Sequence, residues 1–265
     1  MKVIIIGGIA AGTSAAAKLR RIHKDAEIIM YEKSKIVSFG ACGLPYFVGN
    51  FFNDSENMIA RTPEAFIKSG VDVKLEHEVI NIDFDNKKLR VKNLLNGEEF
   101  EDYYDKLVLT IGSWPIVPKF EGGDLENIVL CKNHDHAEVI VKKTEHAKNV
   151  VVIGAGYIGV ELAEAFELKG KNVTLIDAEE RIMAKYLDKE FTDIAENEFK
   201  SKGVKLVLGE KVARFEGENG KVQKVVTDKG SYEGDLVVLC IGFAPATKLV
   251  QGKLDTLKNG AIIRS

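Results

Sequence analysis

Two glycine-rich turns in this sequence could hold the phosphates of a nucleotide. Gly154, Gly156 and Gly159 form a complete GxGxxG between an apolar run and an alanine-rich segment. In that setting the first glycine allows a tight turn, the second lets the backbone approach a pyrophosphate, and the third lets helix and strand pack closely. The N-terminus of the following helix favours an anion. The earlier turn, Gly7–Gly12, has Ile9 at the middle position, where a side chain should limit the approach of a pyrophosphate.

An acidic residue stands at the end of the second strand expected after each turn. Asp177 and Glu32 could each accept hydrogen bonds from the hydroxyls of a ribose. Because a carboxylate repels a 2′-phosphate, Asp177 predicts NADH in preference to NADPH, unless Lys171 or Arg181 neutralises that phosphate. The alternative for the first copy is a decayed unit that only packs.

Cys42 could act as a redox thiol. Glycine and proline are its near neighbours and predict a turn entering a helix, whose N-terminal dipoles would favour the thiolate. Position 47 is Phe, so no second cysteine stands at CxxxxC spacing, and Cys42 would cycle alone through a mixed disulfide or a sulfenic acid. An inert, buried thiol is the alternative, and is what we expect of Cys131 and Cys240.

The elements that must position these residues are duplicated. Residues 2–33 and 149–179 each read as an apolar strand, a glycine turn, an alanine-rich helix, a second strand and an acid, which is the order of a βαβ nucleotide unit. Similar segments close the two copies, DKLVLTIG and DLVVLCIG. We therefore expect an α/β protein with two Rossmann-like, three-layer dinucleotide-binding domains, the second (117–241) inserted in the first (1–116 and 242–265).

Composition excludes several classes of partner. The 265 residues carry a formal net charge of −3, which gives no general field for nucleic acid or an anionic membrane. The longest apolar runs are far too short to span a bilayer. The three cysteines are widely spaced and show no metal-ligand pattern, so we expect no metal site and a reducing, cytoplasmic location.

Several motifs together resemble one known family. They are the Gly7–Gly12 loop, SFGACGLPYFVG around Cys42, Arg61-Thr62-Pro63-Glu64, LVLTIGSWP and GAGYIGVELAEA. The combination resembles the NADH oxidase/peroxidase and coenzyme A-disulfide reductase family, whose members use a single redox cysteine. The resemblance implies that hydride passes from NADH to FAD, and that electrons then pass to a sulfur bonded to Cys42.

The resemblance also assigns cofactor contacts in both copies. Those implied for FAD are Gly7, Gly8, Ile9, Ala10, Ala11, Gly12, Glu32, Lys33, Val79, Thr110 and Gly112. Those implied for NADH are Gly154, Gly156, Tyr157, Ile158, Gly159, Glu161, Asp177 and Gly242. Within the second set, Tyr157 is placed to gate the nicotinamide and Glu161 lies near the flavin.

Two branches of the family differ in their electron acceptor. The coenzyme A contacts of the disulfide reductases fall on Ser14, Lys18, Arg21 and Ser38, and Arg20 adds to this basic helix end. We therefore expect a reductase of a coenzyme A disulfide or persulfide, although a solvated helix face explains the same charges. Oxidases and peroxidases have a histidine in the first loop, where this chain has Ala10 or Ala11. That branch, which uses oxygen or peroxide, is the alternative, and Ala41 replaces an asparagine of the coenzyme A branch.

The family resembled here continues beyond residue 265. Its intact members add a second FAD motif and a C-terminal dimerisation domain, and they form homodimers. The resemblance therefore implies that this chain is truncated, binds NADH better than it retains FAD, and has little disulfide reductase activity. The alternative of a different class is a nucleotide-binding module without catalysis.

Overall fold

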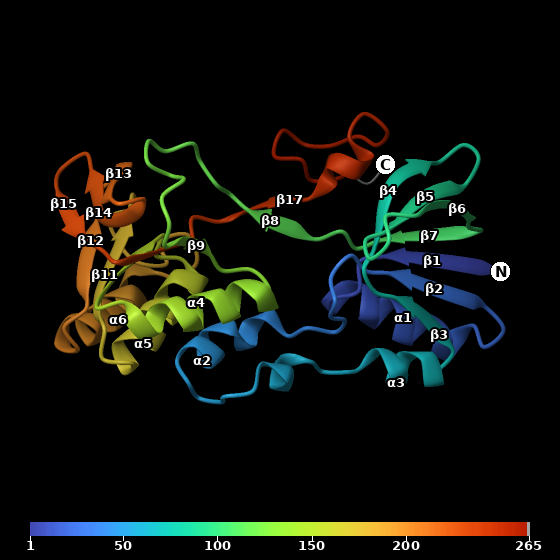
Figure 1. Cartoon of the computed structure of the whole chain (residues 1–265), viewed down its shortest axis with the longest axis horizontal. Helices are drawn as coiled ribbons and strands as arrows, with labels where there is room; N and C mark the ends of the chain where they lie inside the picture. Colours follow the sequence, from blue (N-terminus) through green and yellow to red (C-terminus); the bar gives the residue numbers. More distant parts are fainter. Residues whose placement is uncertain (264–265) are drawn as a thin grey trace. The chain divides into compact units, whose positions relative to one another are not determined.

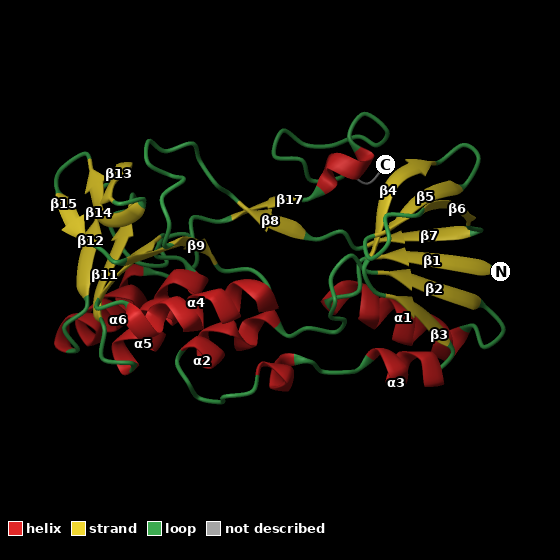
Figure 2. Ribbon diagram, in the orientation of Figure 1, coloured by secondary structure: helices red, strands yellow, loops and turns green. Residues whose placement is uncertain are grey.

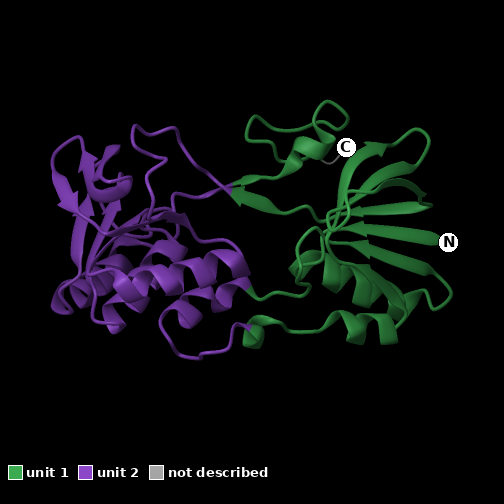
Figure 3. Cartoon of the chain, in the orientation of Figure 1, with its two compact units in different colours: residues 1–40, 56–114, 244–265 green, residues 41–55, 115–243 purple. Residues whose placement is uncertain are grey.

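The chain forms two compact units (Figure 3). A computed structural model describes residues 1–263. Unit 1 comprises Met1–Gly40, Glu56–Trp114 and the chain from Ala244 onward, and unit 2 comprises Ala41–Ser55 and Pro115–Phe243. The segment Ala41–Ser55, which carries Cys42, thus belongs to unit 2, whereas the sequence prediction puts it in the first domain.

Unit 1 is built on a four-stranded parallel sheet, with strand order β3-β2-β1-β7. Its strands are β1 (Lys2–Ile6), β2 (Glu27–Tyr31), β3 (Val71–Lys74) and β7 (Lys106–Leu109). One face packs on α1 (Ala10–Ile22) and α3 (Pro63–Lys68). The other packs on an antiparallel sheet of β4 (His77–Asp83), β5 (Lys88–Asn93) and β6 (Glu99–Tyr103). Figure 2 shows these three layers.

Alternation along β1 explains why the sheet is covered on both faces. Ile4 and Ile6 pack in the core shared with the antiparallel sheet, while Ile5 packs with Ala16 and Phe66 in the core on the helical side. All five side chains are almost completely buried. A strand buried on both faces reads as an unbroken apolar run, which is how β1 reads in the sequence.

Unit 2 repeats this plan with one extra strand (Figure 1). Its parallel sheet has the order β12-β11-β10-β16-β9. The strands are β9 (Ile128–Leu130), β10 (Asn149–Ile153), β11 (Asn172–Asp177), β12 (Lys205–Leu208) and β16 (Leu236–Leu239). The helices are α4 (His134–His146), α5 (Tyr157–Leu168) and α6 (Lys189–Ser201). The antiparallel layer consists of β13 (Val212–Glu218), β14 (Lys221–Thr227) and β15 (Ser231–Glu233). Two three-layer Rossmann-like units confirm the predicted fold class.

Strand register brings equivalent residues to one edge in each unit. Ile6 pairs with Tyr31 and Leu109 in unit 1, and Ile153 pairs with Ile176 and Leu239 in unit 2. The residues that follow these positions therefore meet at the carboxyl edge of each sheet, where parallel α/β sheets bind ligands.

Short elements complete the described chain. They are η1 (Ala41–Gly43), α2 (Leu44–Val48), η2 (Ser55–Met58), β8 (Ser113–Pro115), β17 (Phe243–Pro245) and η3 (Thr247–Val250). Strands β8 and β17, through which the chain passes between the units, pair with each other. Within residues 1–263, no helix has the length and apolar character needed to cross a membrane.

Candidate dinucleotide sites

The glycine turn of unit 2 depends on the absence of two side chains. Gly154 has φ +103°, and its N–H donates to the carbonyl oxygen of Ile176 at 2.8 Å. A Cβ at Gly159 would overlap the carbonyl oxygen of Gly154, so this glycine allows α5 to start directly against the strand. No side chain caps the N-terminus of α5, which leaves the first N–H groups of the helix available to an anion.

The turn of unit 1 follows the same course despite Ile9. Gly7 has φ +100°, and a Cβ at Gly12 would overlap the carbonyl oxygen of Gly7. Ile9 is the N-cap residue of α1 with φ −93°, just as Gly156 is the N-cap residue of α5 with φ −78°. Neither φ requires glycine, so Ile9 can occupy this position, while ψ differs between the two turns (−133° at Ile9 and −171° at Gly156). No side chain caps α1 either.

A carboxylate holds each turn by accepting two backbone N–H groups. In unit 2, Asp177 accepts from Ala155 at 2.5 Å and from Glu179 at 2.8 Å, through different oxygens. In unit 1, Glu32, which is 7% exposed, accepts from Gly8 at 2.6 Å and from Ser34 at 2.8 Å. An ionised carboxylate has about four lone-pair sites, so each retains acceptor capacity for ribose hydroxyls. The two units thus share one constellation of turn, helix end and acid.

The residue after the closing strand differs between the units. Thr110 follows β7, and its hydroxyl donates to the carbonyl oxygens of Ile6 at 2.8 Å and Gly7 at 2.9 Å. Cys240 takes the same place after β16, and its N–H donates to Ile153 at 2.7 Å. Although Cys240 is only partly buried as a residue, burial raises the pKa of its thiol well above the ordinary value. Burial also raises the pKa of Cys131 to about 12. Both thiols stay protonated at neutral pH, in agreement with the inert role expected for them.

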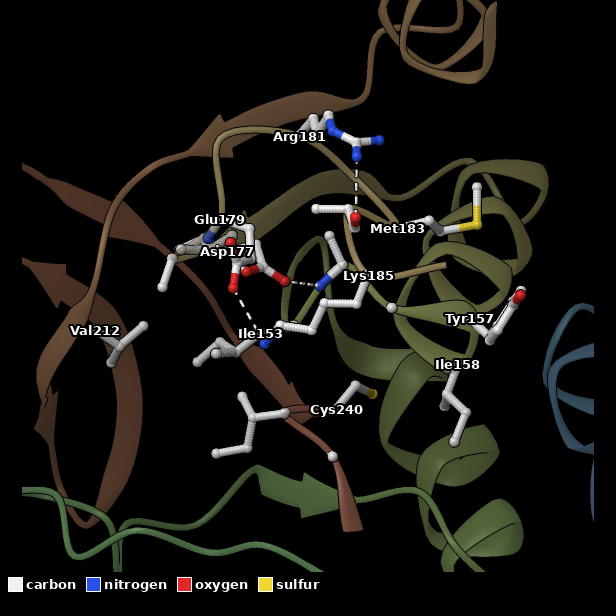
Figure 4. A pocket seen from close by; sticks show the side chains of 18 of the residues that line it. Ile153, Tyr157, Ile158, Asp177, Glu179, Arg181, Met183, Lys185, Val212 and Cys240 are labelled. Atoms are coloured by element: carbon white, nitrogen blue, oxygen red, sulfur yellow. Dashed lines mark hydrogen bonds and ion pairs between the residues drawn. The ribbon is translucent and has the colours of Figure 1, made fainter. Parts of the chain in front are cut away.

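A cavity of about 460 Å³ opens at this edge of unit 2 (Figure 4). This volume lies within the range of small-molecule and cofactor sites. Of the residues predicted to contact NADH, those in its wall are Gly154, Gly156, Tyr157, Ile158, Asp177 and Gly242. Gly159 packs behind the turn, and Glu161 lines a second cavity of about 250 Å³ between α5 and α6. Burial, followed by the neighbouring Glu164, raises the pKa of Glu161.

The loop that follows β11 also borders the cavity, although sequence reasoning missed it. Met183, Lys185 and Tyr186 line the cavity, and the rings of Tyr157 and Tyr186 lie 4.4 Å apart. The position of this loop in the sequence could have indicated its role, because residues directly after the carboxyl end of a parallel strand border the ligand crevice. The Arg181 guanidinium fixes this loop by donating to the carbonyl oxygens of Leu187 at 2.6 Å and Ala184 at 3.0 Å.

These contacts bear on the two cations that could have neutralised a 2′-phosphate beside Asp177. The guanidinium of Arg181 is engaged by the loop itself and is not free to neutralise a phosphate beside Asp177. Lys171 precedes β11, at the opposite end of the strand from Asp177, and donates to the carbonyl oxygen of Ala147 at 2.8 Å. Neither residue is placed to rescue NADPH binding.

The residues predicted to contact FAD lie mostly at the carboxyl edge of unit 1. Ala10 and Ala11 are exposed in the first turn of α1, and Gly112 has φ +70° with open space around it. Lys33 is exposed, 3.8 Å from Glu78 and 5.9 Å from the Trp114 ring. Val79 stands apart from the turn, with its side chain in the core beneath the antiparallel sheet.

The predicted coenzyme A contacts are divided. Ser14, Lys18 and Arg21 are exposed at positions i, i+4 and i+7 of α1, which places them on one face of the helix. Ser38 is half-buried with φ 58°. Arg20 does not join this face as a free cation, because its guanidinium donates to backbone carbonyl oxygens, those of Lys24, Ala26 and Gly70 among them.

Cys42 is exposed, so it is not the buried thiol of the alternative interpretation. It lies in η1 directly before α2, in agreement with the predicted turn into a helix. Helix α2 in turn packs against α4 and α5 of unit 2. Among residues 1–263, no group of three His, Cys, Asp or Glu side chains could hold a metal ion.

Comparison with known proteins places this paired constellation in a family. The model of the pyridine nucleotide-disulphide oxidoreductase family matches residues 1–264. The chain belongs to this family. An NADH oxidase of Enterococcus faecalis is 47% identical over 263 residues, which cover 99% of this chain and 59% of that relative. An NAD(P)H coenzyme A polysulfide/persulfide reductase of Pyrococcus horikoshii is 41% identical over 253 residues, or 94% of this chain and 55% of that protein.

A solved structure shows the same fold. The water-forming NADH oxidase from Lactobacillus brevis, bound to NADH, matches 100% of this chain with a TM-score of 0.95 and 45% identity, and the match covers 58% of that protein. This chain therefore spans about three-fifths of the length of the relatives that it matches. The relatives of this pyridine nucleotide-disulphide oxidoreductase include both oxidases and a persulfide reductase, so they do not single out the coenzyme A branch that the sequence favoured.

Proposed function

We propose that this chain is the dinucleotide-binding part of a flavoprotein that oxidises NADH, with FAD held by unit 1, NADH by unit 2, and Cys42 as the redox thiol. The observation that carries the proposal is the doubled constellation. In each unit, an uncapped helix N-terminus follows a glycine turn that a carboxylate from the neighbouring strand holds in place. Two such sites in one chain suit two dinucleotides. When FAD and NADH are bound, these cofactors would supply the hydride-transfer chemistry.

Unit 2 fits NADH by volume and by chemistry. The cavity has room for an adenosine and the adjoining pyrophosphate, and the start of α5 offers unpaired N–H groups to the phosphates. Asp177 keeps lone pairs for the ribose hydroxyls while it fixes the turn. Its negative charge supports NADH over NADPH. Tyr157, half exposed in the cavity wall, would gate the nicotinamide.

Unit 1 fits FAD through the equivalent groups. Glu32 would hold the adenosine ribose, the start of α1 would face the pyrophosphate, and the exposed Lys33 is in position to contact the adenosine end. Thr110 ties the turn to β1 and keeps the sheet edge close to the site. A Cβ added at Gly112 would meet no atom within 4 Å, so this residue leaves the flavin nucleotide space to approach.

We further propose oxygen as the final electron acceptor. Two oxidases, at 47% and 45% identity, support this choice. Two electrons from NADH, passed on through bound FAD, and two protons would first convert oxygen to hydrogen peroxide. The exposed Cys42 suits the peroxide-reducing step that follows. Its thiolate would attack one oxygen of a peroxide, the O–O bond would break, and water would leave after protonation, with Cys42 oxidised to a sulfenic acid. Two electrons and two protons would then release a second water and restore the thiol.

A coenzyme A persulfide or disulfide reductase is the second candidate. The specific observation in its favour is the exposed face of α1 that carries Ser14, Lys18 and Arg21, which could bind a phosphorylated adenosine. The Pyrococcus horikoshii relative supports it at 41% identity. The order of the two candidates reverses that of the sequence prediction, because the oxidases named above match at higher identity.

The experiment that separates the candidates uses the whole protein as its gene encodes it. With NADH as donor, oxygen consumption and thiol release from coenzyme A disulfide are measured side by side, in wild type and in Cys42→Ser and Arg21→Ala variants. An oxidase consumes oxygen in wild type, releases hydrogen peroxide in place of water in Cys42→Ser, and is unaffected by Arg21→Ala. Faster thiol release, weakened by Arg21→Ala, would establish the second candidate. A colourless protein that binds NADH but turns over neither acceptor would establish the non-catalytic module.

Two properties of the whole protein follow as further proposals. Homodimer formation and a cytoplasmic location fit a flavoprotein of this family with reduced cysteines. Sedimentation of the whole protein would test the dimer.

A further inference from the structure

Cys131 and Cys240 follow neighbouring strands of the parallel sheet in unit 2. Strand β9 pairs in register with β16, with Leu130 opposite Leu239, and the two cysteines are the next residues along these strands. In-register neighbours on adjacent strands lie about 4.8 Å apart. Burial, followed by the neighbouring Cys131, raises the pKa of the Cys240 thiol, so the two thiols are close enough to interact. Two cysteines far apart in the sequence therefore form a pair in the fold.

Both thiols point to the helical side of this sheet. The leucine that precedes each cysteine packs in the core on the antiparallel side, and side chains alternate between the two faces along a strand. The Cβ of Cys240 accordingly lies 3.6 Å from the place that a Cβ on Gly159 would take, at the start of α5. Glu161 in α5 is near enough to Cys131 to raise the pKa of its thiol, after burial as the larger cause. The pair therefore lies under the first turns of α5.

The pair can be reached from the candidate dinucleotide cavity. Cys240 lines this cavity (Figure 4), whereas Cys131 is 3% exposed and is not part of the wall. A small ion would therefore pass Cys240 first. A Cβ at Gly154 would lie 2.4 Å from the carbonyl oxygen of Cys240, so the backbone of Cys240 lies directly against the phosphate turn. An ion held by the pair would thus act on the turn from behind.

The spacing of the pair suits a metal bridge better than a disulfide. A disulfide needs Cβ atoms about 3.5–4.5 Å apart, whereas in-register side chains repeat the strand spacing of about 4.8 Å. Two metal–sulfur bonds of about 2.3 Å in a line span about 4.6 Å. A linear site needs only two ligands, so it agrees with the finding that no group of three His, Cys, Asp or Glu in residues 1–263 could hold a metal ion.

Burial selects the charge of the ion. Two thiolates bound to a monovalent ion leave one negative charge, whereas two thiolates bound to a divalent ion form a neutral complex. Because an uncompensated charge is costly to bury, the neutral complex is favoured. Thiolates bind soft ions. The ion that fits the pair is therefore soft, divalent and linear in its coordination, and mercuric ion has these three properties.

We propose that Cys131 and Cys240 form a two-thiolate site for a soft divalent metal ion, and that an ion bound there inhibits dinucleotide binding by unit 2. On binding, each thiol releases its proton to solvent and its sulfur forms one bond to the ion, with no change in oxidation state. The inhibition rests on the proposed binding of NADH by unit 2, whereas the metal site does not. In unit 1, Thr110 takes the place of Cys240, and β7 is the last strand of the parallel sheet in the described chain, so no equivalent pair forms.

The test of the site uses the 265-residue chain with Cys42→Ser, which removes the exposed thiol. The chain takes up one equivalent of mercuric ion, is treated with excess glutathione, desalted and analysed for mercury. We expect about one ion per chain, held by two sulfurs. Adding Cys131→Ala or Cys240→Ala should lower retention at least about tenfold, because a single thiol loses the effective concentration of its partner. X-ray absorption of the loaded Cys42→Ser chain should show two sulfur ligands, a measurement that leaves the pair unaltered.

Calorimetry with NAD⁺ on the same samples tests the inhibition. The bound ion should raise the dissociation constant of NAD⁺ at least about tenfold in Cys42→Ser, as expected for a group inserted into a packed site. The same treatment should change it by less than about twofold when Cys131→Ala is also present, because that chain retains no ion. Normal NAD⁺ binding by each metal-free variant shows that the variant folds.

The two parts of the inference can fail separately. Loss of mercury from the Cys42→Ser chain, or equal retention after Cys131→Ala and Cys240→Ala, would overturn the metal site. Retained mercury with unchanged NAD⁺ affinity would overturn the inhibition. Failure of the metal-free chain to bind NAD⁺ would overturn the proposed function of unit 2, and the mercury analysis would still decide whether the site exists.

Discussion

Replacing Asp177 with asparagine should weaken NADH binding by unit 2 and leave FAD binding by unit 1 almost unchanged. The carboxylate accepts one N–H from the glycine turn and another from Glu179, through different oxygens. Asparagine has a single acceptor oxygen, so one of these N–H groups would face an NH₂ donor. A hydrogen bond to a charged group contributes about 1.5–3 kcal/mol, and the ribose would lose an ionised acceptor at the same time. A net loss of about 2 kcal/mol weakens NADH binding about 30-fold.

The matched variant is Glu32→Gln, which removes the same kind of carboxylate from the turn of unit 1. Dissociation constants of NADH and FAD are measured by calorimetry for both variants. Asp177→Asn should weaken NADH binding and Glu32→Gln should weaken FAD binding, each with a change of less than about threefold at the other site, as for independent sites. Unchanged NADH affinity in Asp177→Asn would refute the role given to this carboxylate. Equal weakening of both cofactors by both variants would refute the separation of the sites.

Three further predictions concern packing, thiol reactivity and pH. Gly159→Ala should destabilise unit 2 by about 1–3 kcal/mol in thermal unfolding, because its Cβ overlaps a backbone carbonyl, whereas Gly156→Ala should fold normally, with its nearest contact at 3.6 Å. With an aromatic disulfide reagent, the reduced native chain should label rapidly only at the exposed Cys42, and rapid labelling of all three cysteines would contradict the burial described above. Burial, and next a hydrogen bond to Asp102, raise the pKa of Tyr31, so its contribution to stability is complete below the ordinary value of 10.0 and declines as pH rises above it. Tyr31→Phe should therefore flatten the alkaline fall in unfolding free energy, and an unchanged slope would count against this assignment.

Much of the fold could be predicted because the sequence pattern of a βαβ unit occurs twice in the chain. The apolar runs at β1 and β10, each followed by a glycine turn and an acid, predicted both βαβ units. Periodicity alone did not place Ala41–Ser55 with unit 2, because that assignment depends on the packing of α2 against α4 and α5. Such contacts join segments more than 80 residues apart and leave no local pattern.

The candidate site was predicted unevenly for a similar reason. Gly154 and Asp177 stand in a motif with fixed spacing, and the structure places both in the cavity wall. The loop after β11 has no motif, and its course depends on the guanidinium of Arg181, which the sequence presents only as one more cation. The sequence could likewise not show that the guanidinium of Arg20 donates its hydrogen bonds to backbone carbonyl oxygens. In both cases a charge read as available for a ligand stabilises the fold instead.

An anaerobic titration with NADH tests the central claim, that Cys42 accepts electrons together with a flavin. The whole protein, as its gene encodes it, is first reduced, then treated with two equivalents of hydrogen peroxide, which remove two electrons from a reduced flavin and two from the Cys42 thiol, and is freed of excess reagent. A flavin takes up two electrons, and an oxidised Cys42 takes up two more. We expect about two equivalents of NADH per flavin for wild type and about one for Cys42→Ser, by the two-electron count of each centre. One equivalent in both proteins would show that Cys42 is not a redox centre and would contradict the claim.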